Sequence, residues 1–242
     1  MADRSTPRAF KDRDALRAYE AVLLLALREE TGTVAPGVMV HYVLSGAAVA
    51  ELLLSKRIDL EGRKNSPRVR VLDPTPLGDP LLDECLGRIT ASKRPADLRT
   101  WVTRLAQLRG LRRRAAERLC QRGILRAEEQ RVLFFFPRTV YPLADPRPKR
   151  ALVERLSRAI FSDEKDVDPD TVVLLSLAHG GRLLPLVFER RKLKEREGRI
   201  KSVINGEMTG KATREAIEAM QAAVLAASIT PAVIAASAGR SR

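Results

Sequence analysis

The sequence predicts an all-α protein: a single helical domain from which one hydrophobic β-hairpin projects. Apolar residues recur at helical spacing along most of the 242-residue chain, and 45% of its residues are hydrophobic, enough to bury a core. One stretch between helices departs from this pattern, because it combines aromatic and β-branched residues at a density typical of strands. We expect a flexible polar arm at residues 1–13 and one domain over residues 14–242.

The helices are predicted from apolar spacing and from capping residues. Segments 18–30 and 44–57 carry wide apolar faces of Ala, Leu and Val, as core helices do. After a basic loop and a short extended segment at 63–73, a helix begins at Asp79 as N-cap, with Pro80 at its first position. Further helices are expected at 96–108, 149–161, 171–179, 182–197 and 211–229.

The hairpin is predicted at about 131–142, where "RVLFFF" and "TVYPL" are joined by Pro137–Arg138. Its consecutive apolar residues, listed from the first strand, are Leu133, Phe134, Phe135 and Phe136. Consecutive strand residues point to opposite faces, and a two-stranded ribbon can bury only one face on its domain. The second face should therefore meet solvent or a partner, although aromatic residues in such a stretch are more commonly part of the core.

Positive charge is concentrated just before the hairpin. The chain has a net charge of +14, and the stretch "LRGLRRRAAERLCQRGIL" (108–125) contains six arginines. On a helix, Arg109, Arg112 and Arg113 would gather near the N-terminus, where the helix dipole also favours an anion. Charge alone fits a solvated basic face equally well. An apolar projection beside fixed positive charge, however, is the combination that binds an anionic bilayer surface.

Catalytic, metal and cofactor sites are not predicted. The segment at 205–212 lacks the first glycine and the Ser/Thr of a phosphate-binding loop, and the segment starting at Asp166 lacks the glycine and glutamate of a calcium loop. Cys85 and Cys120 are isolated, and His179 lies in an apolar stretch typical of a core histidine. We expect a non-enzymatic, cytoplasmic protein without a cofactor, peripheral on a membrane surface.

Six segments of the chain resemble, in order, the Golgi phosphoprotein 3 family: "EAVLLLALREETG", "AELLLSKRIDLEG", "PTPLGDPLLDECL", "LRGLRRRAAERLCQRGIL", "LFFFPRTVYPL" and "LSLAHGG". The resemblance implies a mostly helical domain with a projecting hydrophobic hairpin. It further implies peripheral membrane binding through phosphatidylinositol 4-phosphate and an adaptor role with protein cargo, without enzymatic activity. The two phosphate-binding arginines of the family's L-R-x-x-R stretch match Arg109 and Arg112.

The chain departs from this family at two positions of the eukaryotic lipid pocket. A tryptophan and an arginine of that pocket are replaced here by Pro36 or Gly37 and by Ser45, with His41 or Tyr42 as candidate substitutes. A generic site for anionic lipid is therefore better supported than phosphoinositide specificity. The Ala- and Arg-rich composition suggests a prokaryotic member, and an exposed hairpin predicts self-association.

The alternative function is nucleic-acid binding. A basic helix followed by a hairpin is also the outline of a winged-helix protein, with 111–123 as recognition helix and 131–142 as wing. A wing that contacts phosphates should be basic and polar, whereas this hairpin carries three Phe and the single tip residue Arg138. The sequence therefore favours the membrane over nucleic acid.

Overall fold

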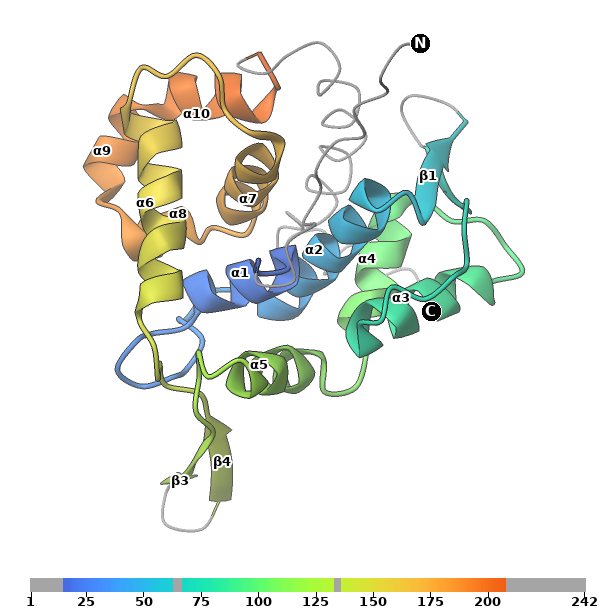
Figure 1. Cartoon of the computed structure of the whole chain (residues 1–242), viewed down its shortest axis with the longest axis horizontal. Coiled ribbons are helices and arrows are strands. Elements are labelled where there is room, and N and C mark those ends of the chain that lie inside the picture. The colour runs from blue at the N-terminus through green and yellow to red at the C-terminus, as the bar shows by residue number, and fades with distance from the viewer. Residues whose placement is uncertain (1–14, 63–66, 133–135, 208–242) are drawn as a thin grey trace, which may run out of the picture.

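The computed structural model describes residues 15–62, 67–132 and 136–207 (Figure 1). The predicted arm at 1–13 and the predicted helix at 211–229 lie outside these residues. The helices are α1 (Ala18–Ala26), α2 (Val40–Leu54), α3 (Pro80–Thr90), α4 (Leu98–Ala106), α5 (Leu111–Gln121), α6 (Arg147–Phe161), α7 (Pro169–Gly180), α8 (Leu184–Val187), α9 (Arg190–Glu195) and α10 (Glu197–Ile204). The strands are β1 (Ile58–Glu61), β2 (Arg68–Val71), β3 (Glu128–Val132) and β4 (Phe136–Val140).

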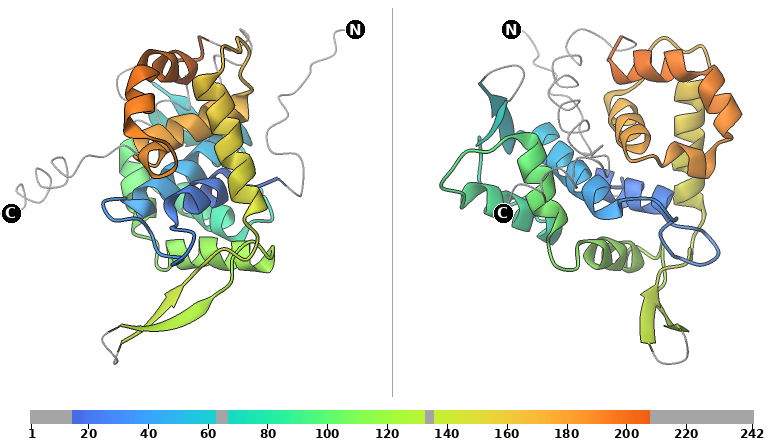
Figure 2. Two further views of the ribbon diagram at one scale, coloured as in Figure 1. Left: turned by 90° about the vertical axis from the view of Figure 1, so that its left-hand side faces the viewer. Right: turned by 180° about the vertical axis from the view of Figure 1, so that it is seen from behind.

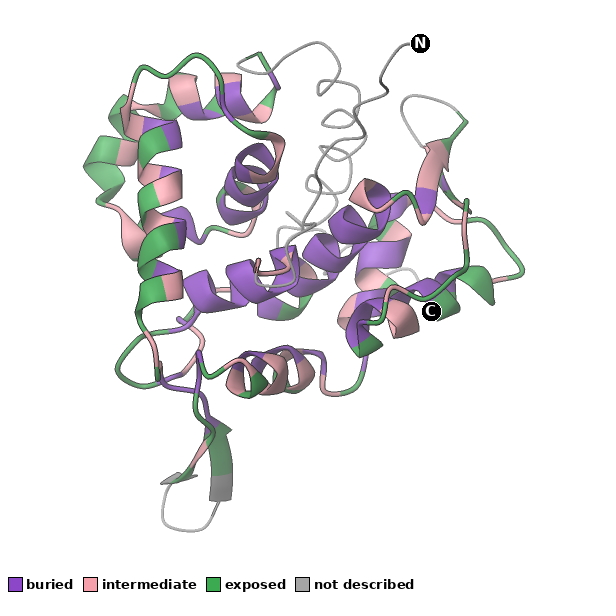
Figure 3. Cartoon of the chain, in the orientation of Figure 1, coloured by how far each residue is buried: buried purple, intermediate pink, exposed green. Residues whose placement is uncertain are grey.

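Helices α1 and α2 form the centre of the molecule. Every residue of α1 is buried, and most of α2 is buried as well (Figure 3). Helices α3, α4 and α5 pack on one side of this pair, α6 and α7 pack on the other, and α10 packs on α6 and α7. The wide apolar faces of the two N-terminal segments are thus explained by burial on all sides.

The described chain is mostly helical, but the all-α prediction is wrong because the structure contains two small antiparallel sheets. The sheet that was not predicted pairs β1 with β2, with Ile58 opposite Val71. Alternation along β2 explains the pairing, since Val69 is buried while Arg68 and Arg70 are exposed. The predicted helix at 44–57 ends earlier, at Leu54.

The second sheet, β3–β4, is the predicted hairpin with a different register. Pro137 and Arg138, predicted to form the turn, lie inside β4 opposite Arg131 and Gln130. The connection between the strands falls at 133–135 instead. A proline is tolerated here because each strand of a two-stranded ribbon has an unpaired edge.

The ribbon extends away from the helices in each view (Figures 1 and 2). Its described stem is polar, with Glu129, Gln130, Arg138 and Thr139 exposed. Leu133, Phe134 and Phe135 lie outside the described residues, and Phe136 is placed only through its pairing with Val132 in the ladder. The hydrophobic character of the hairpin tip therefore stays a prediction.

The base of the ribbon is fixed to the turn after α1. The amide of Tyr141 donates a hydrogen bond to the carbonyl oxygen of Gly32 at 3.0 Å. Gly32 has a φ of 60°, and a Cβ atom added to it would lie 2.1 Å from the backbone nitrogen of Pro142. Only glycine permits both this backbone conformation and this close approach.

Helix termini follow their predicted caps in part. Asp79 is the N-cap of α3, because its Oδ1 accepts hydrogen bonds from the amides of Leu81 and Leu82. The single helix predicted at 182–197 is wrong: extended backbone at Phe188 and Glu189 separates α8 from α9.

Candidate functional site

The six arginines of the basic stretch lie along α5 and at its two ends. Gly110 has a φ of 70° and is the N-cap, so the helix begins at Leu111. Arg109 therefore precedes the helix rather than lying on it, which corrects the predicted helical spacing, while Arg112 and Arg113 occupy the first turn. The arginines divide into an inner set that contacts the core and an outer set that does not.

The inner set consists of Arg114, Arg118 and Arg122, which bind acidic side chains of other helices. Arg122 Nη1 lies 2.8 Å from Glu20 Oε2, and Arg118 Nε lies 3.2 Å from Glu20 Oε1. Arg114 pairs with Glu84 and also donates to the carbonyl oxygen of Pro80 at 2.9 Å. These contacts attach α5 to α1 and α3 along its length.

Three acidic side chains, Glu20, Glu51 and Asp79, are buried beside α5; Glu20 and Asp79 receive contacts from the inner set, and Glu51 lies 3.6 Å from Arg17 Nη1. Their exposed fractions are 0%, 2% and 0%. Asp79 Oδ2 accepts a hydrogen bond from the Tyr19 hydroxyl at 2.7 Å and lies 3.3 Å from Arg118 Nε. Burial, together with the charge of Asp79, raises the pKa of Tyr19 far above its ordinary value, so the phenol remains a donor.

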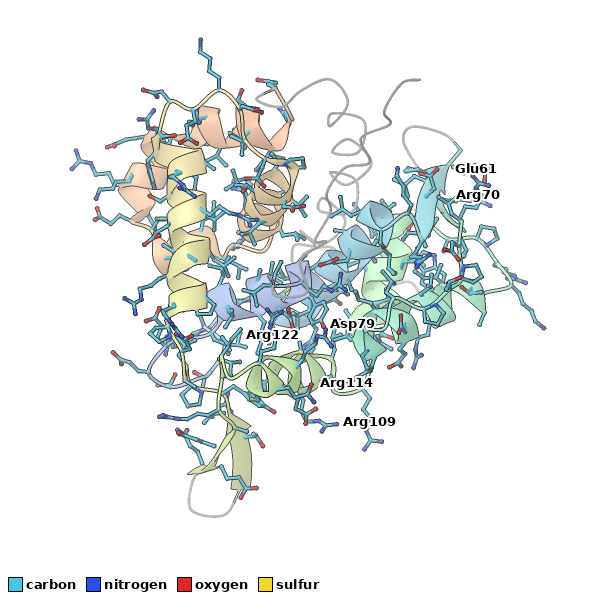
Figure 4. The ribbon with its side chains drawn as sticks, in the orientation of Figure 1. Glu61, Arg70, Asp79, Arg109, Arg114 and Arg122 are labelled. Atoms are coloured by element: carbon cyan, nitrogen blue, oxygen red, sulfur yellow. The ribbon has the colours of Figure 1, made fainter. Side chains whose placement is uncertain are left out.

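The outer set consists of Arg109, Arg112 and Arg113. Among the described residues, the guanidinium groups of Arg109 and Arg112 have no hydrogen-bond or ion-pair partner. Arg113 differs, because its Nη1 lies 2.7 Å from Glu117 Oε1. Figure 4 shows Arg109 extending from the start of α5 away from the body of the protein. Two of the three predicted phosphate-binding arginines are thus free to meet an external anion.

Arg112 lies within electrostatic range of His41, at the start of α2. Incomplete hydration lowers the pKa of His41, although part of its surface is exposed, and the positive charge of Arg112 lowers it further. The imidazole of His41 is therefore mainly neutral at pH 7, so it does not repel the guanidinium group of Arg112. Ser45, in contrast, is fully buried, and its hydroxyl donates to the carbonyl oxygen of Tyr42 at 3.0 Å.

Helix α5 and the β3–β4 ribbon lie on the same side of the molecule (Figures 1 and 2). Arg109, at the start of α5, and the described stem of the ribbon therefore lie on the same side of the molecule. No helix in the described part of the chain has both the length and the hydropathy needed to cross a bilayer. Within the same residues, no group of three or more His, Cys, Asp or Glu side chains is placed to hold a metal ion.

Comparison with known proteins identifies the family. The model of the family described as Golgi phosphoprotein 3 (GPP34) matches residues 18–220, most of the chain. The chain belongs to the Golgi phosphoprotein 3 family. It is also similar to vacuolar protein sorting-associated protein 74 of Eremothecium gossypii, with 28% identity over 214 residues. This match covers 75% of the chain and 64% of the relative, so the chain spans less than two thirds of that protein's length. The prokaryotic origin suggested by composition is not supported by these matches.

The burial of Glu20 and Glu51 was not predicted from the sequence of this family member, although the sequence carries a signal for it. Glu20 and Glu51 each stand in a long apolar run, in "AYEAVLLLA" and "GAAVAELLL". A carboxylate buried among such residues requires a cation or amide donors. The inner arginines and the amide of Ala18, which donates to Glu51 Oε1 at 2.6 Å, supply them.

The unfolding free energy of this Golgi phosphoprotein 3 family member should depend on pH through Glu51. Burial raises the pKa of Glu51 to about 7, although the amide of Ala18 and the charge of Arg17 oppose the shift. The folded state therefore binds the proton more tightly than the unfolded state. The protonated Glu51 therefore adds its full contribution to the free energy of unfolding below pH 4.5. This contribution, about 3 kcal/mol, is lost as the pH rises through about 7.

Glu51→Gln isolates this effect, because glutamine resembles the protonated carboxyl group. Urea unfolding of both proteins between pH 5 and pH 8 should show the variant gaining up to about 3 kcal/mol relative to the parent as pH rises. A stability difference that does not change over this range would mean that Glu51 titrates normally in the folded protein.

Proposed function

We propose that the protein binds anionic phospholipid headgroups at a membrane surface, as a peripheral and non-enzymatic adaptor of the phosphatidylinositol 4-phosphate-binding kind. The observation that carries this proposal is that the guanidinium groups of Arg109 and Arg112, at the start of α5, have no ion-pair or hydrogen-bond partner in the part of the chain that the structure describes. Arginine binds phosphate oxygens through two parallel hydrogen bonds, and the N-terminus of a helix favours an anion. Arg113 adds a third positive charge, partly neutralised by Glu117.

The hairpin is the second part of the proposed membrane contact. The ribbon extends on the side of α5, and its connection carries Leu133, Phe134 and Phe135, followed by Phe136. Apolar side chains beside fixed positive charge bind the interface of an anionic bilayer by burial and by Coulomb attraction together. Protein cargo and a second copy of the chain, joined through the hairpin, are the proposed protein partners, and the cytoplasmic face is the proposed location.

Nucleic-acid binding is the weaker candidate. A recognition helix at 111–123 would need its arginines free for phosphates and bases. Arg114, Arg118 and Arg122 are instead held by the acidic side chains of α1 and α3. The helix therefore presents fewer free arginines than its sequence suggests.

Retention on lipid vesicles tests the proposal. The protein should sediment with vesicles containing phosphatidylglycerol, and retention should fall as salt rises from 50 to 500 mM. Each basic residue near such a surface contributes about 1 kcal/mol, within a Debye length of about 8 Å at physiological salt. Equal retention on neutral phosphatidylcholine vesicles, or tighter binding to duplex DNA at matched salt, would contradict it.

Selectivity among headgroups should be modest. No tryptophan stands at Pro36 or Gly37, and Ser45 is buried, so two sources of inositol recognition in the family are missing. At equal surface charge, the preference for phosphatidylinositol 4-phosphate over phosphatidylglycerol should stay below about tenfold, or about 1.4 kcal/mol. A much larger preference would show that His41 or Tyr42 completes the pocket.

A further inference from the structure

A second group of unpaired cations lines a pocket formed by α7, α8, α9, α10 and the loop before α2. The pocket has a volume of about 440 Å³. Its cations are Arg182, Arg190 and Lys194, and none of the three has an ion-pair partner among the described residues. Two other cations of α9, Arg191 and Lys192, are paired with glutamates of the same segment. Within α9, the two cations that line the pocket are thus the ones without an ion-pair partner among the described residues.

The remaining wall of the pocket is apolar. Leu184 and Ile200 are each only 2% exposed, whereas Leu186 is 41% exposed, a high value for a large hydrophobic residue. Leu193 and Val38 complete this wall. A pocket with positive charge on one side and aliphatic side chains on the other fits a ligand that is itself anionic at one end and apolar at the other.

The acidic residue of the pocket offsets its cations only in part, because its carboxylate acts on Lys194 but forms its ion pair with a lysine outside the lining. Glu197 lines the pocket, but its Oε1 lies 2.6 Å from Lys201 Nζ, a residue outside the lining. His179, predicted to lie in the core, is instead exposed at the end of α7 and lines the same pocket. Its ring nitrogens add hydrogen-bonding capacity to the charged side.

Backbone geometry brings Arg182 to this position at a cost in free energy. A Cβ atom on Gly181 would lie 2.8 Å from Val43 Cγ2, so the close packing of α7 on α2 requires glycine there. The left-handed conformation that ends α7 then falls on Arg182, with a φ of 56°. Residues with a Cβ atom adopt this conformation unfavourably, and such positions gather at functional sites.

We propose that this pocket binds a soluble organic phosphate with an apolar body. A phosphate group carries up to two negative charges and three acceptor oxygens, which match two arginines and a lysine that form no ion pair with the described residues. The apolar wall would bury the body of the ligand. Helices α8 and α9 lie on a flank of the molecule rather than on the side of α5 and the ribbon (Figure 1). The site uses none of the arginines or hairpin residues proposed to contact the membrane, although Pro36 and Gly37, at the position of the family's lipid-pocket tryptophan, line part of it.

Calorimetric titration with phenyl phosphate tests this site in the full-length protein. We expect a dissociation constant of about 1 mM or lower. Binding should weaken at least tenfold for inorganic phosphate, which lacks the apolar body, and for benzyl alcohol, which lacks the phosphate. Arg190→Gln with Lys194→Gln should weaken phenyl phosphate binding at least tenfold. The matched control Arg191→Gln with Lys192→Gln removes the same charge from the same helix and should change binding less than twofold.

Three results would overturn the proposal: no binding by the parent protein, an equal loss in the two double variants, or full binding by Arg190→Gln with Lys194→Gln. Tenfold tighter binding of soluble dihexanoyl phosphatidate would assign the pocket to a lipid headgroup instead. Arg109→Glu with Arg112→Glu should bind phenyl phosphate as the parent does. The pocket proposal is thus tested independently of the proposed membrane function. If the protein does not bind vesicles, the measurement of phenyl phosphate binding still stands.

Discussion

Replacing Arg109 and Arg112 together by glutamate should abolish retention of the protein on anionic vesicles. Each arginine contributes about 1 kcal/mol of attraction, and each glutamate adds a repulsion of similar size, so the pair should cost about 4 kcal/mol or about a thousandfold in affinity. Neither side chain has a partner within the described residues, so thermal stability should be unchanged. Co-sedimentation with phosphatidylglycerol vesicles measures the first quantity, and a melting curve measures the second.

The matched control changes the net charge by the same amount at two arginine and lysine positions on another helix. Arg191 and Lys192 on α9 are 89% and 60% exposed, and their joint replacement by glutamate also lowers the net charge by four units. This control should keep most of its vesicle binding. Retention of binding by the Arg109 and Arg112 variant would place the lipid site elsewhere, with the basic residues around Arg68 and Arg70 as the next candidate.

Gly32→Ala should destabilise the fold more than any other single methyl addition considered for this chain. The positive φ of Gly32 costs about 1–2 kcal/mol for alanine, and the contact with Pro142 adds about 1–3 kcal/mol of overpacking. Urea unfolding should therefore show a loss of about 2–5 kcal/mol. The base of the ribbon, attached here through Tyr141, would be displaced from the turn after α1 in the remaining folded protein.

Gly37→Ala separates the two contributions to this loss. Gly37 also has a positive φ, of 81°, but a Cβ atom there would meet nothing within 4 Å. Its replacement should cost only about 1–2 kcal/mol, the backbone part alone. If the two variants were equally stable, the close approach of the turn to the ribbon would not exist in solution.

The sequence predicted most of the helices because apolar periodicity and capping residues are local signals. Asp79 illustrates this, since an acid followed by proline fixes the start of α3 whatever surrounds it. The β1–β2 sheet was missed because its first strand, at Ile58–Glu61, follows a helix directly and has only four residues. The predicted register of the hairpin is wrong because proline commonly marks a turn, whereas Pro137 lies in a strand with an unpaired edge, which accepts proline.

The candidate site was predicted by residue type but not by contact. Net charge and spacing indicate which arginines gather near the start of α5, and they cannot distinguish a paired arginine from a free one. That distinction depends on Glu20, Glu84 and Asp79, which lie 24 or more residues away along the chain and reach α5 only through tertiary packing. The pairing of Arg113, in contrast, could have been predicted from the sequence, because its partner Glu117 stands four residues later on the same helix.

The separation of inner and outer arginines on α5 also bears on how such a surface can diverge. The inner set is tied to carboxylates in the core, so mutations there are selected against through loss of the fold. The outer set can be exchanged one residue at a time without that penalty. Lineages that share the scaffold can therefore drift in ligand preference while their structures stay superimposable, and the start of α5 is where such drift should be sought.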